Sequence, residues 1–468
     1  TQAVHSTHPQ LIHDFVDAWP KFSGNARRFL LSALLAGFAY SGLYFLLANL
    51  FLVRLGYDEG FIGIFIATGA ASFALSSLPA GIAGRRFGPR KAMIGGYLVL
   101  MTGLILLSMV AVVPAVWRSA WLLSCCALRE FGNSFYIVNA NPFLMETTHQ
   151  DERRFVFAAR GAVVPLAGFL GALAGGVLPD WSATILNTGL SDPVTFLVPL
   201  LIGGLVLLPG WFALLMTKKE SVLSPGRELP QTVSEVTSSF PMEEAQTPTE
   251  PGTGTSSRET QAPAPTNSLP GDPGTFPAKP ILAMVGTGLL FIASMSVSGS
   301  FFNLYMDQAL GVATSRIGTV LAMGQLLAAP AGLMLAPLSA RLGYDRTFIL
   351  SALGVAAGAL LMGLSGHWLL ASAGTVMITA LSAIAFPAIT VYQQELVHPE
   401  WRPIMSGAYM MSVALGWSVM ASGGGYFIAE VGYQQLFLLG AVLTGVGTIL
   451  FGAYTRSVPA GSAHLTES

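Results

Sequence analysis

Long apolar runs separated by short polar segments make up most of the chain. A helix that crosses a bilayer needs about 20 mostly apolar residues, and the sequence contains twelve runs of roughly that length. They lie at about 30–54, 60–83, 92–115, 119–145, 155–178, 193–216, 281–308, 314–338, 344–365, 367–394, 404–428 and 433–455. The pattern therefore predicts an all-α integral membrane protein with twelve transmembrane helices.

A polar segment divides these runs into two sets of six. Residues 217–280 hold eleven of the 28 prolines, among Ser, Thr, Gly and Glu, and such a segment cannot bury enough apolar surface to offset its ordering entropy. We therefore predict five parts: a cytoplasmic N-terminal segment at 1–29, a six-helix half at 30–216, a disordered cytoplasmic linker at 217–280, a second six-helix half at 281–456 and a cytoplasmic tail at 457–468.

The two halves repeat each other. A shift of 255 residues places Arg86 on Arg341 and Gly88 on Gly343. Two parallel six-helix repeats are a transporter architecture, in which the binding site is expected near the bilayer midplane between the repeats.

Composition agrees with a membrane protein and excludes several function classes. Of the 468 residues, 53% are hydrophobic and only 10% are charged, whereas soluble domains carry roughly 25% charged residues. A net charge of −1 argues against a nucleic-acid partner, which requires basic patches. The only cysteines, Cys125 and Cys126, are adjacent, which excludes a disulfide scaffold. The sequence has no metal-ligand spacing and no motif of a hydrolase or a phosphate-binding loop, so we expect no metal, no cofactor and no enzyme.

The distribution of Lys and Arg predicts the orientation. With the N-terminus inside, sixteen of these residues lie on the inner side and three, Arg54, Arg118 and Arg316, on the outer side. Because cytoplasmic loops carry the excess of basic residues, we expect both termini in the cytoplasm. We also expect a multi-pass protein of the cell (plasma or inner) membrane, and a monomer.

The loop between the second and third runs reads "GIAGRRFGPRK" (81–91), and its copy in the second half reads "APLSARLGYDR" (336–346). These loops resemble the glycine- and arginine-containing motif of the major facilitator superfamily, and the resemblance covers all twelve helices. It implies that family's fold and transport by alternating access. The family's motif aspartate is absent, because Arg85 and Ala340 occupy the acidic positions. The usual latch of the inner gate therefore lacks its acid.

A substitute for that latch follows the fourth and tenth helices. Both "ETTHQDER" and "ELVHPEWR" place Glu seven residues before Arg, a pattern similar to that of sugar-type members of the family. We predict a cytoplasmic charge clasp in which Glu146 holds Arg86 or Arg90, and Glu395 holds Arg341, when the inner side is closed. The full predicted gate comprises Arg86, Arg90, Glu146, Arg153, Arg341, Glu395 and Arg402.

Arg129 and Glu130 lie near the middle of the fourth helix, where a lipid-facing charge costs several kcal/mol. Successive helix positions are about 100° apart, so we expect a separate partner for each. The polar positions around them predict a water-filled cavity. Many proton-coupled members of the family have an arginine in helix 4 shortly before a glycine, and the resemblance implies the same role here. We therefore predict Glu130 as the proton-coupling carboxylate and Arg129 as the cation that modulates it or binds an anionic group.

Other side chains on the first, fourth and seventh helices are expected to contact substrate, because these helices line the cavity in the family. They are Tyr40, Tyr44, Asn49, Asn133, Tyr136, Ser300 and Asn303. Asp307 lies near the outer end and is expected to be an exposed or gate residue, and Arg160 is expected to extend to the cytoplasmic face.

The leading functional hypothesis is a proton-coupled secondary active transporter of a small organic solute, with efflux favoured by the aromatic and amide residues of the candidate site. Its partners would be the solute, protons and the lipid bilayer. One alternative is a sugar-like uniporter or symporter, which the Glu-to-Arg spacing favours. Another is a receptor or sensor that no longer transports, which the two missing aspartates favour.

Overall fold

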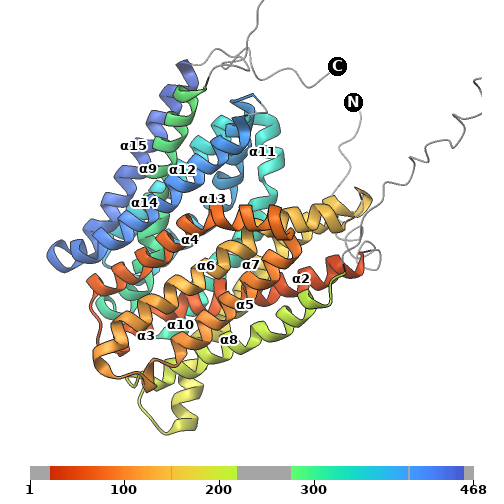
Figure 1. The fold of residues 1–468 in the computed structure, drawn as a ribbon. Helices are drawn as coiled ribbons and strands as arrows, with labels where there is room; N and C mark the ends of the chain where they lie inside the picture. Colours follow the sequence, from red (N-terminus) through yellow and green to blue (C-terminus); the bar gives the residue numbers. More distant parts are fainter. Residues whose placement is uncertain (1–21, 149, 219–275, 399–400, 458–468) are drawn as a thin grey trace, which may run out of the picture.

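The computed structural model describes residues 22–148, 150–218, 276–398 and 401–457, and its regular elements there are helices. The first half contains α2 (Gly24–Ala36), η2 (Gly37–Tyr44), α3 (Phe45–Arg54), α4 (Glu59–Phe87), α5 (Pro89–Ser108), η3 (Val110–Val112), α6 (Ala115–Thr147), α7 (Gln150–Leu186) and α8 (Val194–Leu215). The second half contains α9 (Ala278–Leu304), η4 (Tyr305–Ala309), α10 (Thr314–Leu333), α11 (Leu335–Leu342), α12 (Tyr344–Leu364), α13 (Trp368–Glu395), α14 (Arg402–Val431) and α15 (Tyr433–Ser457). Figure 1 shows the two halves side by side.

These elements form the twelve expected spans. The first runs unbroken over Gly24–Arg54 and the seventh over Ala278–Ala309, because the π-helical turns η2 and η4 continue the α-helices beside them. Ten segments are long and apolar enough to cross a membrane, and α10 with α11 would form another span with a 46° bend. The twelfth is α6, whose 33 residues include the polar positions of the candidate site.

Several helices begin before the predicted runs, the first of them by the largest margin. The first starts at Gly24 rather than at residue 30, and its polar first turn is stabilised by the end of α8. The side-chain amide of Asn25 donates to the carbonyl of Lys218 at 3.0 Å and accepts from its backbone N–H at 2.9 Å. Helix α9 starts at Ala278, so the polar linker ends slightly before the predicted residue 280. Most of that linker, residues 219–275, lies outside the described ranges.

The internal repeat is visible in the backbone. Gly88 separates α4 from α5 with a φ of 89°, and Gly343 separates α11 from α12 with a φ of 83°. Residues other than glycine rarely adopt this backbone conformation. The two motif loops therefore turn the chain in the same way between the second and third spans of each half.

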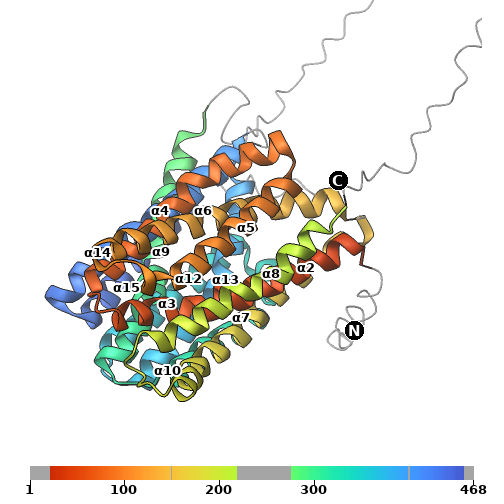
Figure 2. The ribbon, with the colours of Figure 1, turned by 60° about the horizontal axis from the view of Figure 1, so that its bottom comes forward.

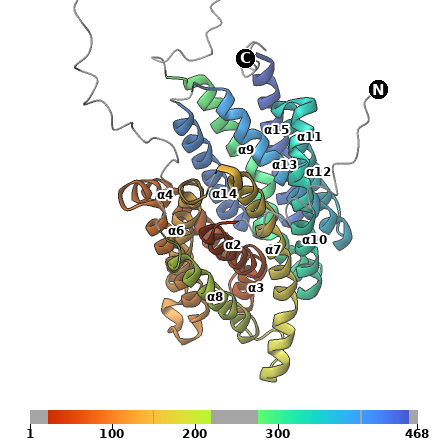
Figure 3. The same cartoon turned by 90° about the vertical axis from the view of Figure 1, so that its right-hand side faces the viewer.

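The halves contact each other through α4 against α14 and α7 against α10 (Figures 2 and 3). At both contacts glycines allow the backbones to approach closely. A Cβ atom on Gly63 would clash with the carbonyl oxygen of Ala421, and one on Gly318 would lie 2.8 Å from the Cα of Gly176. Small residues serve the same purpose wherever membrane helices pack closely.

The contacts between the halves are unevenly distributed along the helices. We call the end where α2 and α9 begin the terminal face and the opposite end, where α3 ends and α4 begins, the far face. Every hydrogen bond that the structure shows between described residues of the two halves uses residues 45–67 of the first half, that is, the central or far-face part of its helices. The halves are therefore held together by these bonds from the middle of the bundle to the far face.

Candidate functional site

The site is built around the polar pair in the middle of α6. Arg129 and Glu130 are 4% and 8% exposed, and the Arg129 Nη2 and Glu130 Oε1 atoms lie 2.8 Å apart. The expectation that each would need a separate partner was therefore wrong. The long guanidinium side chain reaches back to the neighbouring carboxylate, which the angle between the two Cβ positions alone does not reveal.

Neighbouring helices come close to α6 at glycines beside this pair. A Cβ on Gly103 of α5 would lie 2.7 Å from the backbone nitrogen of Arg129, and one on Gly69 of α4 would lie 3.1 Å from Cγ of Glu130. Helices α4 and α5 both pack against α6. These small residues therefore enclose the two charges between helices and remove them from lipid.

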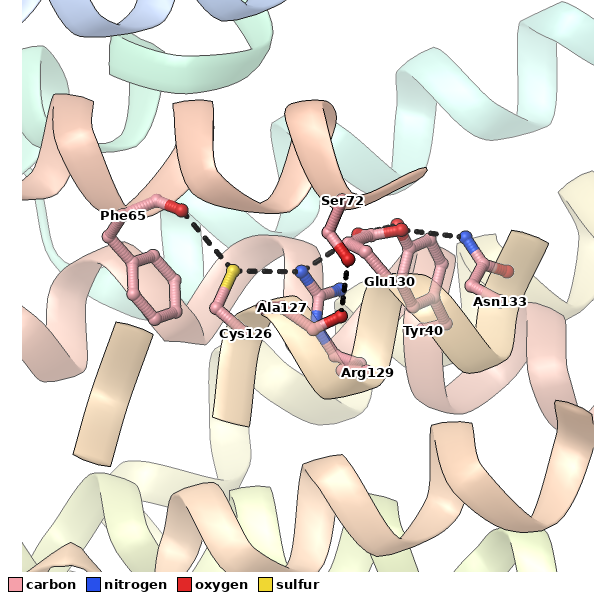
Figure 4. Close-up of polar contacts among 8 residues, drawn as sticks. All are labelled: Tyr40, Phe65, Ser72, Cys126, Ala127, Arg129, Glu130 and Asn133. Carbon is pink, nitrogen blue, oxygen red and sulfur yellow. Dashed lines mark hydrogen bonds and ion pairs between the residues drawn. The ribbon is translucent and has the colours of Figure 1, made fainter. Parts of the chain in front are cut away.

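Besides its contact with Arg129, the Glu130 carboxylate accepts hydrogen bonds from two other candidate residues (Figure 4). The Tyr40 hydroxyl donates to Oε1 at 2.5 Å, and the Asn133 Nδ2 donates to Oε2 at 3.0 Å. Tyr40 comes from the π-helical turn η2 of the first span, and π turns are frequent at functional sites. With the Arg129 contact, both carboxylate oxygens of Glu130 have partners.

Aromatic rings cover the Arg129 guanidinium. Its Cζ lies 3.9 Å from the centroid of the Tyr44 ring and 5.0 Å from that of Tyr40, and cations gain electrostatic stabilisation over such ring faces. The Nη2 atom also donates to the Cys126 sulfur at 3.6 Å, and that thiol donates to the carbonyl of Phe65 at 3.2 Å (Figure 4). The sequence analysis did not assign Cys126 to the site, although its position three residues before Arg129 places it on the same helix face.

Three predicted substrate residues connect the halves in this conformation. The Asn49 side chain donates to the carbonyl of Ser300 at 2.7 Å, and the Asn303 side chain donates to the carbonyls of Phe45 at 3.0 Å and Leu46 at 3.1 Å. The Ser300 hydroxyl is buried and has no partner among the described residues. Contact of these side chains with a solute stays a prediction.

Tyr136 lies inside the first half, away from the Arg129–Glu130 pair. Its hydroxyl shares a 3.2 Å hydrogen bond with the Ser32 hydroxyl, and its ring packs against Phe29 and Tyr97. Of the seven predicted substrate residues, the structure thus brings Tyr40, Tyr44 and Asn133 to the pair.

An ion pair at the far face joins the first span of each half. Both guanidinium Nη atoms of Arg54 lie 2.8 Å from the two carboxylate oxygens of Asp307. Nearby, the Tyr433 hydroxyl donates to Glu59 at 3.1 Å across the halves. Asp307, which was expected to be an exposed or gate residue, therefore pairs with Arg54, a partner that the sequence analysis did not assign. The equivalent positions of Arg54 and Asp307, near the ends of the first and seventh spans, were the signal for it.

On the terminal face the predicted clasp is not engaged. Within the described ranges no ion pair joins Glu146 to Arg86 or Arg90, or Glu395 to Arg341. Arg90 instead donates to the end of α8, at the Thr217 hydroxyl and the Leu215 carbonyl, and Arg402 donates to the Gln394 carbonyl at 2.9 Å. The Arg153 side chain lies outside the described residues. The clasp, which belongs to the state closed on this face, stays a prediction.

The half-buried Arg160 makes contacts with two neighbouring helices. Its Nη1 atom donates to the side-chain oxygen of Asn141 on α6, and its Cζ lies 5.6 Å from the ring of Phe29 on α2. Its expected extension to the cytoplasmic face stays a prediction.

Comparison with known proteins agrees with the fold. The sequence profile described as Major Facilitator Superfamily matches residues 29–269 and 284–468, whereas no curated protein matches the sequence significantly. Similar solved structures include the nucleoside transporter NupG, with a TM-score of 0.63 and 14% identity over 93% of this chain and 99% of that one. The peptide transporter POT in complex with sulfate has a TM-score of 0.67 and 14% identity over 92% and 94% of the two chains. A bacterial homolog to the human lysosomal transporter Spinster, in an inward-facing and occupied conformation, has a TM-score of 0.63 and 14% identity over 98% and 99%. At these identities the likeness establishes the fold.

Proposed function

The chain belongs to the major facilitator superfamily, and from that premise we propose that it is a secondary active transporter that moves a small organic solute, coupled to protons at Glu130. The observation that carries this proposal is the Arg129–Glu130 pair, buried in the middle of α6 and bonded to the first span through Tyr40. An ionisable residue inside a membrane helix is costly and is a functional candidate by default. A carboxylate held by three donors would exchange these bonds when it takes up a proton.

The distribution of bonds between the halves supports alternating access. With the termini in the cytoplasm, as the basic residues predict, the far face is the outer side, and this conformation is the one closed to the outside. The opposite state would break the Arg54–Asp307 pair and the asparagine bonds at Asn49 and Asn303. It would form the clasp at Glu146 and Glu395 instead. Rocking of one half against the other about a central site is the general mode of such folds.

The solute is expected to contact Tyr40, Tyr44 and Asn133, which share the neighbourhood of the ion pair. Asn49, Ser300 and Asn303 would become available when the halves separate, because their present bonds cross between the halves. Efflux is the direction that we propose from the aromatic and amide character of these residues.

Proton flux in proteoliposomes tests the proposal. Vesicles containing the purified protein and a trapped pH-sensitive dye receive sugars, organic acids, amino acids, nucleosides or amphipathic cations in turn. We expect at least one class to drive proton movement in the wild type and none to do so in Glu130→Gln. Glu430→Gln, which neutralises an exposed carboxylate near the end of α14 outside the candidate site and the predicted gate, is the control and should retain coupling.

The alternatives predict different results in the same vesicles. Solute movement without proton movement, unchanged in Glu130→Gln, would support a uniporter and contradict proton coupling. Binding of a solute to the protein with no movement of that solute would support a receptor. Imposing the proton gradient in either orientation then decides between efflux and uptake.

A further inference from the structure

The Arg129 guanidinium has hydrogen-bonding capacity that the protein does not use. Its side chain carries five N–H groups, and only Nη2 has acceptors, at Glu130 and at the Cys126 sulfur. The Nε and Nη1 atoms are buried and have no partner among the described residues. Buried polar groups are nearly always hydrogen-bonded, so two unpartnered nitrogens on a 4% exposed cation require an explanation.

Donors outnumber acceptors around this cation. The only carboxylate nearby, Glu130, already accepts from Arg129, Tyr40 and Asn133. The rings of Tyr44 and Tyr40 lie against the guanidinium, and neither hydroxyl accepts a hydrogen bond from the Nε or Nη1 atom. What the site lacks is an acceptor, and a planar guanidinium matches a carboxylate through two parallel N–H bonds.

The charge balance of the membrane interior indicates the same ligand. In the second half, the described spans carry their charged residues only in their end turns. In the first half, the buried Arg129 and Glu130 cancel each other. If Glu130 became neutral, Arg129 would be a buried cation without a counter-ion, which is strongly destabilising. A negatively charged solute would restore the balance.

We propose that the solute is an organic anion whose carboxylate binds the Arg129 guanidinium, and that protonation of Glu130 completes this binding site. The inference rests on the proposed transport function and names its substrate class. A proton from solution neutralises the Glu130 carboxylate, and its ion pair with Nη2 breaks. Nη2, together with either Nε or Nη1, then donates two parallel hydrogen bonds to the carboxylate of the solute. One proton and one carboxylate thus bind together and leave the charge of the site unchanged.

The groups that face Glu130 are compatible with this exchange. On α6 they are Arg129 and Cys126, and on η2 they are Tyr40 and Tyr44. Helix α4 presents Gly69, which does not titrate, and α5 approaches at Gly103. Glu130 is therefore the only carboxyl group in this set, and the proton that accompanies the anion is assigned to it.

Matched pairs of charged and neutral probes test the proposal. The full-length protein in lipid nanodiscs is heated with benzoate, phenylacetate or hexanoate, and in parallel with the corresponding amide, at about pH 5.5 and about pH 8. We expect a carboxylate to raise the melting temperature of the wild type, more at the lower pH, and its amide to have no effect. Glu130→Gln, which imitates the protonated acid, should bind the same carboxylate equally at both pH values.

Variants of Arg129 separate the two-point hydrogen bonding of its guanidinium from its positive charge. Arg129→Lys keeps the charge but loses the two-point geometry, so we expect the affinity for the carboxylate to fall about tenfold, the effect of one charge-assisted hydrogen bond. Arg129→Gln should abolish binding. The unliganded melting temperature of each variant shows whether it folds, and Arg129→Lys together with Glu130→Gln keeps the test informative if Arg129→Gln does not.

Three results would overturn the inference: equal stabilisation by carboxylate and amide, undiminished carboxylate binding in Arg129→Lys and Arg129→Gln, or no stabilisation by any carboxylate. Transport assays with the same probes distinguish this failure from failure of the proposed function. Proton-coupled movement of a neutral solute would leave the transporter intact and remove the anion site. Carboxylate binding without movement would support the site and contradict transport.

Discussion

The Arg54–Asp307 contact is the only ion pair that the described residues show between the two halves, and its removal should open the far face. Arg54 ends the first span and Asp307 lies in the last turn of the seventh. Each oxygen of the carboxylate faces one nitrogen of the guanidinium at 2.8 Å. Replacing Arg54 by Gln removes the ion pair and leaves a polar side chain of similar length.

The magnitude follows from burial and geometry. The side chains are 21% and 11% exposed, so the pair lies between a surface ion pair, worth about 0–1 kcal/mol, and a fully buried one, whose disruption costs about 3–5 kcal/mol. We therefore expect a loss of about 1–2 kcal/mol in favour of the opened far face, a factor of roughly 5–30 in the population ratio. Arg54→Gln should have a larger effect than Asp307→Asn, because the more buried Asp307 is then left without its counter-ion. In Asp307→Asn, Arg54 keeps its contact with the Phe196 ring at 5.4 Å.

Distances between spin labels on the two halves measure this population. Val116 and His367 are exposed and lie where α6 and α13 begin at the far face. Cysteines introduced there can be labelled for double electron–electron resonance. The native Cys125 and Cys126 are buried, so a labelling stoichiometry of two checks that only the introduced thiols have reacted.

We expect the longer-distance population to grow in Arg54→Gln and to return toward the wild-type value in the charge-swapped variant Arg54→Asp/Asp307→Arg. The wild type, Arg54→Gln, Asp307→Asn and the variant with both substitutions form a double-mutant cycle, which isolates the coupling of the pair. An unchanged distance distribution in Arg54→Gln would refute the reasoning. It would mean that the neutral hydrogen bonds of Asn49 and Asn303 hold the halves together without help from the charges.

Three further changes have expected outcomes. Gly63→Ala places a methyl group against the Ala421 carbonyl, so it should also increase the longer-distance population in the spin-label experiment. Tyr40→Phe removes the hydroxyl donor to Glu130 but keeps the ring, and it should lower the free energy of unfolding by about 1.5–3 kcal/mol, the value of a hydrogen bond to a charged group. Arg90→Ala removes hydrogen bonds to the Thr217 hydroxyl and the Leu215 carbonyl and should lower the melting temperature.

The fold was predictable because lipid imposes a strong and simple constraint. Each span must be long and mostly apolar, and the resulting twelve runs agree with the observed helices apart from shifts at their ends. The shift at Gly24 illustrates the limit of that rule. Asn25 is polar enough to suggest the end of the membrane core, yet its side chain satisfies the backbone of Lys218. The helix therefore continues beyond the apolar run, which hydropathy alone does not predict.

The candidate site was predictable in location but not in its bonds. A charge in the middle of a span identifies Arg129 and Glu130, whichever way the helix is rotated. The partners depend on that rotation and on side-chain reach. Both decide that Arg129 turns back to Glu130 and that Tyr136 packs away from the pair against Tyr97.

Helix α6 shows why the residues of the candidate site lower the hydropathy by which a membrane span is recognised. Its polar residues make it the long helix that falls outside the apolar candidates, yet Arg129, Glu130 and Asn133 are each at most 8% exposed. A span facing lipid must be apolar, whereas a span enclosed by α4 and α5 can carry charges whose partners are protein side chains. The glycines at positions 69 and 103 make that enclosure possible, because a larger residue at either would push a neighbouring helix away from the charged pair. The weakest membrane signal in the sequence therefore marks the helix on which we expect coupling to depend.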